Sequence, residues 1–299
     1  MNFFKQKKNL AFIFFIFCTT IFMYGLSELP VMDRDEARFA TASKTMLETN
    51  DFIDIKMNDE VRYKKPIGIY WAQVAANLIL GEKPFDKIWI YRIPSIIGVV
   101  GSIFLIFFYV LRRFDINTAF LSSFFLICSL LSISEIHQAK TDGLLFFFVN
   151  LCNLIIFEAI REKKLHFFFK FCFWISLSCS VLIKGPISLI FIFTPLIAIS
   201  LIYKENFFRY VWIWRGLIIF FFIVLPWFIA ITLKSGGVFW HESVIHDLLK
   251  KVGTGQESHG FPPGYYTILL FIMFWPGSIF LISFCKKLKN SWRKILKEK

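Results

Sequence analysis

The chain has 299 residues, of which 57% are hydrophobic and 18% are charged, and its formal net charge is +13. Soluble globular domains are typically about 45–50% apolar and about 25% charged, so the composition excludes an ordinary soluble enzyme. The basic residues do not form a stripe with interleaved aromatics on a soluble domain, which argues against nucleic acid as a partner. The positive charge instead suits the anionic headgroups of membrane lipids.

The apolar residues gather in runs close to the roughly 20 residues that a helix needs to cross a membrane. We therefore predict an all-α polytopic membrane protein. Segments of alternating polarity, which would indicate a transmembrane β-barrel, are not the pattern here. About eight spans are expected, near residues 10–27, 91–111, 118–134, 143–160, 167–183, 186–203, 216–233 and 265–285.

The first span follows the basic stretch KQKK and has no small-residue cleavage site after it, so we expect a retained anchor rather than a signal peptide. Short basic segments with few acids are typical of cytoplasmic loops. By this rule the cytoplasmic segments are residues 1–9, 112–117, 161–166, 204–215 and 286–299. Residues 1–285 are thus expected to form the membrane domain and residues 286–299 a basic cytoplasmic tail. The outer side then carries two long loops, 28–90 and 234–264, and the turn at 134–143.

The first outer loop opens with the charged stretch MDRDEARFATASKTMLET, residues 32–49. Asp33 followed by Glu36 has the spacing of a capping box and predicts a helix that begins here. Arg38 shares a helical face with Asp35, three residues before it. One interpretation is that these acids only cap the helix, and another is that they form a carboxylate active site at the membrane surface. The spacing leaves both open.

The rest of this loop reads as an extended piece at residues 52–57, a turn at MNDE, the basic stretch RYKKP and a helix that starts at Pro66. That helix carries Tyr70 and Trp71 and is flanked by polar residues, so it is predicted to lie in the membrane interface. Two charged residues stand near span ends outside this loop. Asp142 either caps the fourth span or serves as a second site carboxylate. Lys184 either reaches toward the membrane surface or binds a phosphate.

Neither cysteines nor histidines form a metal-binding pattern. The six cysteines lie in or at the ends of apolar runs without a C-x-x-C pair, so neither disulfides nor a cysteine metal site is expected. His241, His246 and His259 in the last outer loop are spaced by five and thirteen residues, which does not favour a zinc site. The carboxylates of Asp35 and Asp142 are oxygen ligands of the kind that a divalent cation prefers. Their spacing in the sequence neither favours nor excludes a bound divalent cation.

Seven segments occur in the order DRDEARFATASKTML, RYKKPIGIYW, YRIPSIIG, AKTDGLL, LIKGPISL, LPWF and HGFPPGYY…FWPGS. Together they resemble the N-terminal membrane part of bacterial glycosyltransferases similar to the lipid A aminoarabinose transferases, and more distantly the protein O-mannosyltransferases. The resemblance runs from about residue 25 to 285. It implies the type C glycosyltransferase fold, a location in the bacterial inner membrane, and an active site that faces the periplasm and takes a polyprenyl-phosphate sugar as donor.

The resemblance also implies roles for individual residues. Asp35 is the acid of DEAR that carries the chemistry, Glu36 is the acid beside it, and Asp142 of TDG is a supporting acid. The substrate-binding residues that it implies are Arg38, Tyr63, Lys65, Lys184 and His259. The long prenyl tail of the donor also needs an interfacial groove, and Tyr70 is expected to line it. A carboxylate can deprotonate the attacking hydroxyl as an oxocarbenium-like state forms. Lys65 and Arg38 would stabilise the leaving phosphate, and direct displacement would invert the anomeric centre.

The predicted function is therefore transfer of a sugar from a polyprenyl phosphate to lipid A or another outer-leaflet acceptor. Such glycosyltransferases usually continue with further spans and a soluble outer domain. We expect that domain to be absent here, which raises the prospect of a C-terminal partner chain. Two alternatives stay open. A lipid or solute transporter would place charges within its spans or use paired broken helices. A truncated, inactive relative would use the charged loop only for folding.

Overall fold

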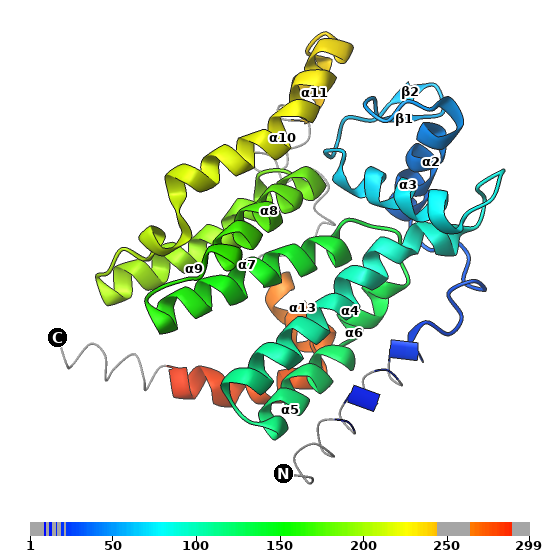
Figure 1. Cartoon of the computed structure of the whole chain (residues 1–299). Helices are drawn as coiled ribbons and strands as arrows, with labels where there is room; N and C mark the ends of the chain where they lie inside the picture. The colour runs from blue at the N-terminus through cyan, green and yellow to red at the C-terminus, as the bar shows by residue number, and fades with distance from the viewer. Residues whose placement is uncertain are drawn as a thin grey trace. The chain divides into compact units, whose positions relative to one another are not determined.

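The computed structural model describes residues 22–243 and 264–288, together with residues 9, 12, 13, 16, 19 and 20. Figure 1 shows the chain from its N-terminus to its C-terminus. It divides into two compact units. The larger comprises Met23–Leu105 and Glu135–Glu257, and the smaller comprises Met1–Phe22, Ile106–Ser134 and Ser258–Lys299.

Within the described ranges, four helices are long and apolar enough to cross a membrane: α4 (Ile88–Arg113), α7 (Asp142–Glu162), α8 (Phe167–Lys184) and α10 (Ile213–Ser235). Two bent pairs would raise that number to six. The helices α5 (Ile116–Ile127) and α6 (Leu130–Ile136) meet at 61°, and α13 (Tyr265–Met273) meets the helical segment Gly277–Leu288 at 115°. That segment opens with the 3₁₀ turn η3 (Gly277–Phe280).

The prediction of an all-α polytopic membrane protein is confirmed. Five of the predicted spans match α4, α7, α8, α9 (Ile187–Tyr203) and α10 to within a few residues. The expected spans at 118–134 and 265–285 are instead broken helices, each bent at a short interruption. The expected span at 10–27 is described only in part, since seven of its 18 residues are not described, so the number eight stays a prediction.

In the larger unit, α8 packs against α7, α9 and α10, as Figure 1 shows. The side chains between α7, α8, α9 and the 3₁₀ helix η1 (Phe207–Val211) form one apolar cluster. Trp174 of α8 lies in it with its indole Nε1 donating to the carbonyl of Val211 (2.6 Å). Gly216 of α10 lies against this indole, where a Cβ atom would approach Trp174 to 1.7 Å.

The first outer loop forms the sequence of elements that the charge pattern predicts. Helix α2 (Arg34–Thr49) begins at the N-cap Asp33, whose carboxylate accepts from the backbone N–H of Asp35 (3.2 Å), and Asn50 ends it in the left-handed conformation. A hairpin of β1 (Lys56–Met57) and β2 (Glu60–Val61) follows, with Lys56 opposite Val61. Helix α3 (Gly68–Leu80) completes the loop.

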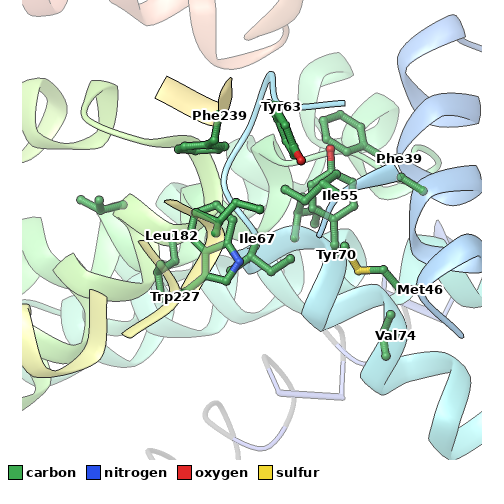
Figure 2. Close-up of a cluster of buried hydrophobic side chains, with 14 of the residues drawn as sticks. Phe39, Met46, Ile55, Tyr63, Ile67, Tyr70, Val74, Leu182, Trp227 and Phe239 are labelled. Carbon is green, nitrogen blue, oxygen red and sulfur yellow. The ribbon is translucent and has the colours of Figure 1, made fainter. Parts of the chain in front are cut away.

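The loop is fixed to the helices by a second apolar cluster. It joins α2, the hairpin region and α3 to α8, α10 and the short helix α11 (Val238–Trp240). Figure 2 shows Tyr63 facing Phe239, and their rings meet edge-on at 5.7 Å. Trp227 of α10 donates from its indole Nε1 to the carbonyl of Ile53 (3.1 Å). Lys234 at the end of α10 pairs with Asp51.

Two glycines permit close backbone approaches that shape this unit. A Cβ on Gly68, at the start of α3, would lie 2.8 Å from the backbone carbonyl of Leu182 in α8. A Cβ on Gly143, in the first turn of α7, would lie 2.8 Å from the carbonyl oxygen of Ser95 in α4. Because real Cβ atoms do not approach backbone this closely, both positions require glycine. The first contact sets α3 on α8, and the second sets the turn before α7 on α4.

In the smaller unit, aromatic side chains contact one another within α5 and between α5 and η3. Phe120 stacks on Phe124 along α5 with ring centroids 5.9 Å apart. Phe125 meets Phe280 of η3 at 5.2 Å. The bend between α5 and α6 is stabilised by Ser129, whose hydroxyl contacts that of Ser132 (2.8 Å) and accepts from its backbone N–H (3.2 Å).

Candidate active site

Four segments of the larger unit meet around one small cavity of about 150 Å³. They are the first turns of α2, the stretch that follows β2, the turn before α7 and the C-terminal end of α8. Each segment is held locally by the caps, hairpin and helix crossings described above. The cavity is lined by Asp35, Arg38, Phe39, Arg62, Lys64, Lys65, Lys140, Thr141, Asp142 and Lys184.

The charge of this lining is strongly asymmetric. Six of the ten lining residues are cationic and two are carboxylates. A concave site lined mainly by one sign of charge raises the local concentration of ligands of the opposite sign. The cavity is therefore suited to an anion, and a phosphate is the anion that lysine and arginine bind most readily in proteins.

Asp35 lies on the first turn of α2 and keeps about half of its side chain exposed. Its Oδ1 is 3.4 Å from Nη1 of Arg38 and 3.9 Å from Nη2 of Arg62. Both separations exceed the 2.7–2.9 Å that is typical of a strong charge-assisted hydrogen bond. Asp35 thus stands beside two guanidinium groups without being enclosed by them, and its oxygens stay accessible from the cavity.

Asp142 faces the cavity from the first residue of α7 and pairs with Lys184 at the end of α8. The interpretation of Asp142 as an N-cap is wrong, because the N-cap is Thr141, which makes no side-chain capping bond. The neighbouring Lys140 pairs with Asp33, and this contact holds the pKa of the Asp33 carboxyl below its ordinary value. The two lysines Lys140 and Lys184, each paired with a carboxylate, therefore both contribute to the cavity lining.

Glu36 is not among the cavity-lining residues, although the sequence placed it with the catalytic acids. Its side chain is fully buried, and Arg92 of α4 donates to it from Nε (2.7 Å) and Nη2 (3.3 Å). Glu36 also accepts from the backbone N–H groups of Met32 and Ala139, each at 3.0 Å. The capping-box bond to the N-cap is thus replaced by a bond one residue earlier. Glu36 joins the start of α2 to α4 and to the turn that carries Lys140.

Both predicted tyrosines lie in the apolar cluster that fixes the first loop (Figure 2). The hydroxyl of Tyr63 donates to Asp54 (2.6 Å), and burial together with this bond raises the Tyr63 pKa. Tyr70 is fully buried. Burial raises its pKa to about 12, and the charge of Arg62 opposes that rise. The expectation that Tyr70 lines an open groove does not match this position. His259 lies outside the described residues.

The structure thus brings Asp35, Arg38, Lys65, Asp142 and Lys184 together in one cavity, while their chemical roles stay predictions. Sequence reasoning missed three cations of the lining: Arg62, Lys64 and Lys140. All three occur in stretches that the sequence marks as charged, RYKKP and AKTDG. Arg62 and Lys64 are neighbours of the predicted Tyr63 and Lys65, and Lys140 is two residues before Asp142. This closeness in the sequence is the signal that could have found them. Among the residues described, no group of three or more His, Cys, Asp or Glu side chains could hold a metal ion.

The helical fold matches that of a type C glycosyltransferase of known structure, which confirms the predicted fold. A crystal structure of ArnT from Cupriavidus metallidurans bound to undecaprenyl phosphate is similar to this chain, with a TM-score of 0.79. The match covers 93% of this chain and 51% of that one at 16% sequence identity. The family model of dolichyl-phosphate-mannose-protein mannosyltransferases matches residues 8–238. The chain belongs to this family.

Curated relatives agree with the resemblance noted from the motifs. An undecaprenyl phosphate-alpha-4-amino-4-deoxy-L-arabinose arabinosyl transferase from Shewanella sediminis is 23% identical over 98% of this chain and 53% of its own length. A second transferase of this name, from Proteus mirabilis, is 25% identical over 97% of this chain and 52% of its own length. An uncharacterized protein from Aquifex aeolicus is 26% identical over 97% of this chain and 64% of its own length. The chain thus spans about half the length of the transferases it matches.

Proposed function

We propose that this chain is a multi-pass glycosyltransferase of the bacterial inner membrane whose cavity faces the periplasm. It transfers a sugar from a polyprenyl-phosphate donor to lipid A or another outer-leaflet acceptor. The observation that carries the proposal is the single cavity in which the accessible carboxylate of Asp35 stands among six cationic side chains. A base and a phosphate-binding surface within one small site are what this reaction needs. The names of the relatives support the donor class.

In the proposed reaction, the acceptor's hydroxyl oxygen attacks the anomeric carbon of the sugar, and its proton passes to Asp35. The bond from that carbon to the phosphate oxygen breaks, and the electron pair leaves with the polyprenyl phosphate. Arg38 and Lys65 stabilise the charge that develops on this leaving group. Attack from the face opposite the phosphate inverts the anomeric centre. Asp142, paired with Lys184, orients the sugar or acceptor within the cavity.

The prenyl tail of the donor requires an apolar surface next to the phosphate site. Helix α10 carries two apolar hollows, of about 550 Å³ and about 300 Å³, that share Leu225 and Ile229. The second extends to Trp240, near the outer end of α10 where Lys234 meets the first loop. We propose that the tail lies along this face, which is continuous over several helical turns.

The proposal is tested by turnover of a radiolabelled polyprenyl-phosphate sugar in membranes that contain the 299-residue chain. Asp35→Asn keeps the size of the side chain but removes the base, so we expect loss of transfer by a factor of about 10²–10⁴ with unchanged membrane insertion. Asp115→Asn is a matched control, because Asp115 caps α5 and is not a lining residue of the cavity.

Transfer at the wild-type rate by Asp35→Asn would contradict the catalytic assignment. Label that stays on the donor with the wild-type chain, in folded and inserted protein, would contradict the proposed transfer by this chain.

A further inference from the structure

Arg62 follows β2 directly and lines the cavity, yet only 9% of its side chain is exposed. Its guanidinium carbon lies 5.4 Å from the centre of the Phe39 ring, over which it stacks. Its Nη2 is 3.9 Å from Oδ1 of Asp35, which is too long for a hydrogen bond. Its Nε is buried and donates to no acceptor in the part of the chain that the structure describes.

Arg92 shows what a purely structural buried arginine looks like in the same unit. All three of its nitrogens donate to close acceptors: Nε to Glu36 (2.7 Å), Nη1 to Leu26 and Leu29 (2.8 and 2.9 Å), and Nη2 to Pro30 (2.8 Å). Buried arginines usually have their donors satisfied in this way. Arg62 is buried as well and lines the cavity, but its Nε has no acceptor among the described residues. Its surroundings are therefore incomplete in a way that a ligand oxygen would complete.

We propose that Arg62 is a donor-binding residue that exchanges partners during the reaction. Without donor, its guanidinium lies beside Asp35. With the donor in place, it binds oxygens of the phosphate, and Asp35 then accepts the hydroxyl proton without a second cation beside it. The proposal rests on the proposed function and adds a residue that links phosphate binding to the state of the base.

Three features fit this exchange. The planar fork of arginine matches phosphate oxygens with two parallel hydrogen bonds, which lysine cannot do. The stack on Phe39, itself a lining residue, fixes the plane of the guanidinium beside the cavity. The contact between Arg62 and Asp35 is weak, because at 3.9 Å the two groups are not hydrogen-bonded, so little is lost when Arg62 binds a phosphate instead.

The first test measures binding of undecaprenyl phosphate to the full chain in phosphatidylcholine nanodiscs. Arg62→Gln should weaken binding roughly 10- to 100-fold, the range expected for losing hydrogen bonds to a charged group. Arg62→Lys keeps the positive charge but lacks the planar guanidinium, so its affinity should lie between those of the wild type and Arg62→Gln. Arg161→Gln removes the same charge from an exposed side chain outside the cavity and should bind as the wild type does. Undecaprenol, which has the tail but no phosphate, should bind all variants equally.

The second test asks whether Arg62 and Asp35 are coupled. Asp35→Asn should tighten undecaprenyl phosphate binding in the wild-type background, because Arg62 no longer has a competing carboxylate. The same change should have a clearly smaller effect in the Arg62→Gln background. Independent, additive effects of the two substitutions would overturn the exchange. Thermal unfolding of each variant confirms that it is folded before binding is compared.

The outcomes separate this inference from the proposed function. Normal binding by Arg62→Gln, with weakened binding by Lys65→Ala, would overturn the role of Arg62 and leave the phosphate site intact. Phosphatidylglycerol at equal charge is the comparison lipid. If the wild type binds undecaprenyl phosphate no more tightly than phosphatidylglycerol, the cavity has no specific phosphate site. That result would overturn both the role of Arg62 and the proposed function. Weakened binding by Arg62→Gln together with non-additivity supports the exchange.

Discussion

Asp33 and Asp35 lie two residues apart at the start of α2 but have different surroundings. Asp33 caps the helix and pairs with Lys140, so it connects the first loop to the turn before α7. Asp35 faces the cavity and lies beside two arginines at long range. One carboxylate is engaged in fixing two segments, and the other is accessible to a ligand. Their environments differ because Asp33 is the N-cap and Asp35 lies in the first turn of α2.

The Asp33–Lys140 pair predicts a pH dependence of stability. The pKa of Asp33 lies below its ordinary value of 3.8 in the folded chain, so its contribution is present above that value and is lost as pH falls through the lowered pKa. Asp33→Asn keeps the helix cap but loses the charge. At pH 7 we expect the variant to be less stable by up to about 1 kcal/mol, because the pair is partly exposed.

Thermal unfolding of the two proteins in detergent checks this prediction. The difference between their midpoints should be present at pH 5–7 and should shrink as the pH is lowered below 3.8. A difference that stays constant across this range would mean that the charge of Asp33 contributes nothing through Lys140.

At the scale of elements, the buried pair of Glu36 and Arg92 fixes α2 to α4. Through Ala139 the same carboxylate fixes the turn that carries Lys140 and Asp142. Segments that line the cavity are thus held by one buried ion pair, whose members are not lining residues themselves. Its members have their hydrogen-bonding groups well satisfied, which is the condition under which a buried charge pair is tolerated.

Arg92→Met should destabilise the chain by about 3–5 kcal/mol, since it leaves the Glu36 carboxylate buried without its partner. Denaturant unfolding in mixed micelles measures this loss. Lys44→Ala is a suitable control because Lys44 and Glu48 form a pair on the surface of α2 at 3.8 Å, where we expect a change of roughly 0.5 kcal/mol or less. Similar small losses for both variants would contradict the role of the buried pair.

At the scale of the whole molecule, the first loop depends on a helix far away in the sequence. Trp227 and Lys234 of α10 hold Ile53 and Asp51. Trp227→Phe keeps an aromatic ring and removes one hydrogen bond to the loop, so we expect a loss of about 1 kcal/mol and faster proteolysis of the loop. Trp240→Phe also removes an indole bond, but one to Thr232 near the end of α10. Equal proteolysis of the loop in both variants would contradict the link.

The sequence predicted the helices well, because long apolar runs and short basic loops depend on local composition. It also predicted Asp33 as the cap of α2, and it picked out five of the ten residues that line the cavity. Arg62 was missed because its place depends on the hairpin that follows Asn50 and on stacking over Phe39, neither of which a linear pattern encodes. Glu36 was placed at the site as the acid beside Asp35, and Tyr70 was expected to line an interfacial groove for the prenyl tail. Their burial depends on α4 and on the cluster of Figure 2, which form only in three dimensions.

The hydrogen bond from Trp227 to Ile53 joins residues 174 positions apart, and this has a consequence for biogenesis. At ribosomal speeds of about 5–20 residues per second, α10 is made roughly 10–35 s after the first loop. During that interval the loop lacks Trp227 and Phe239, which complete its apolar cluster. A chaperone or protease that meets the loop in this interval encounters an apolar core that is still open.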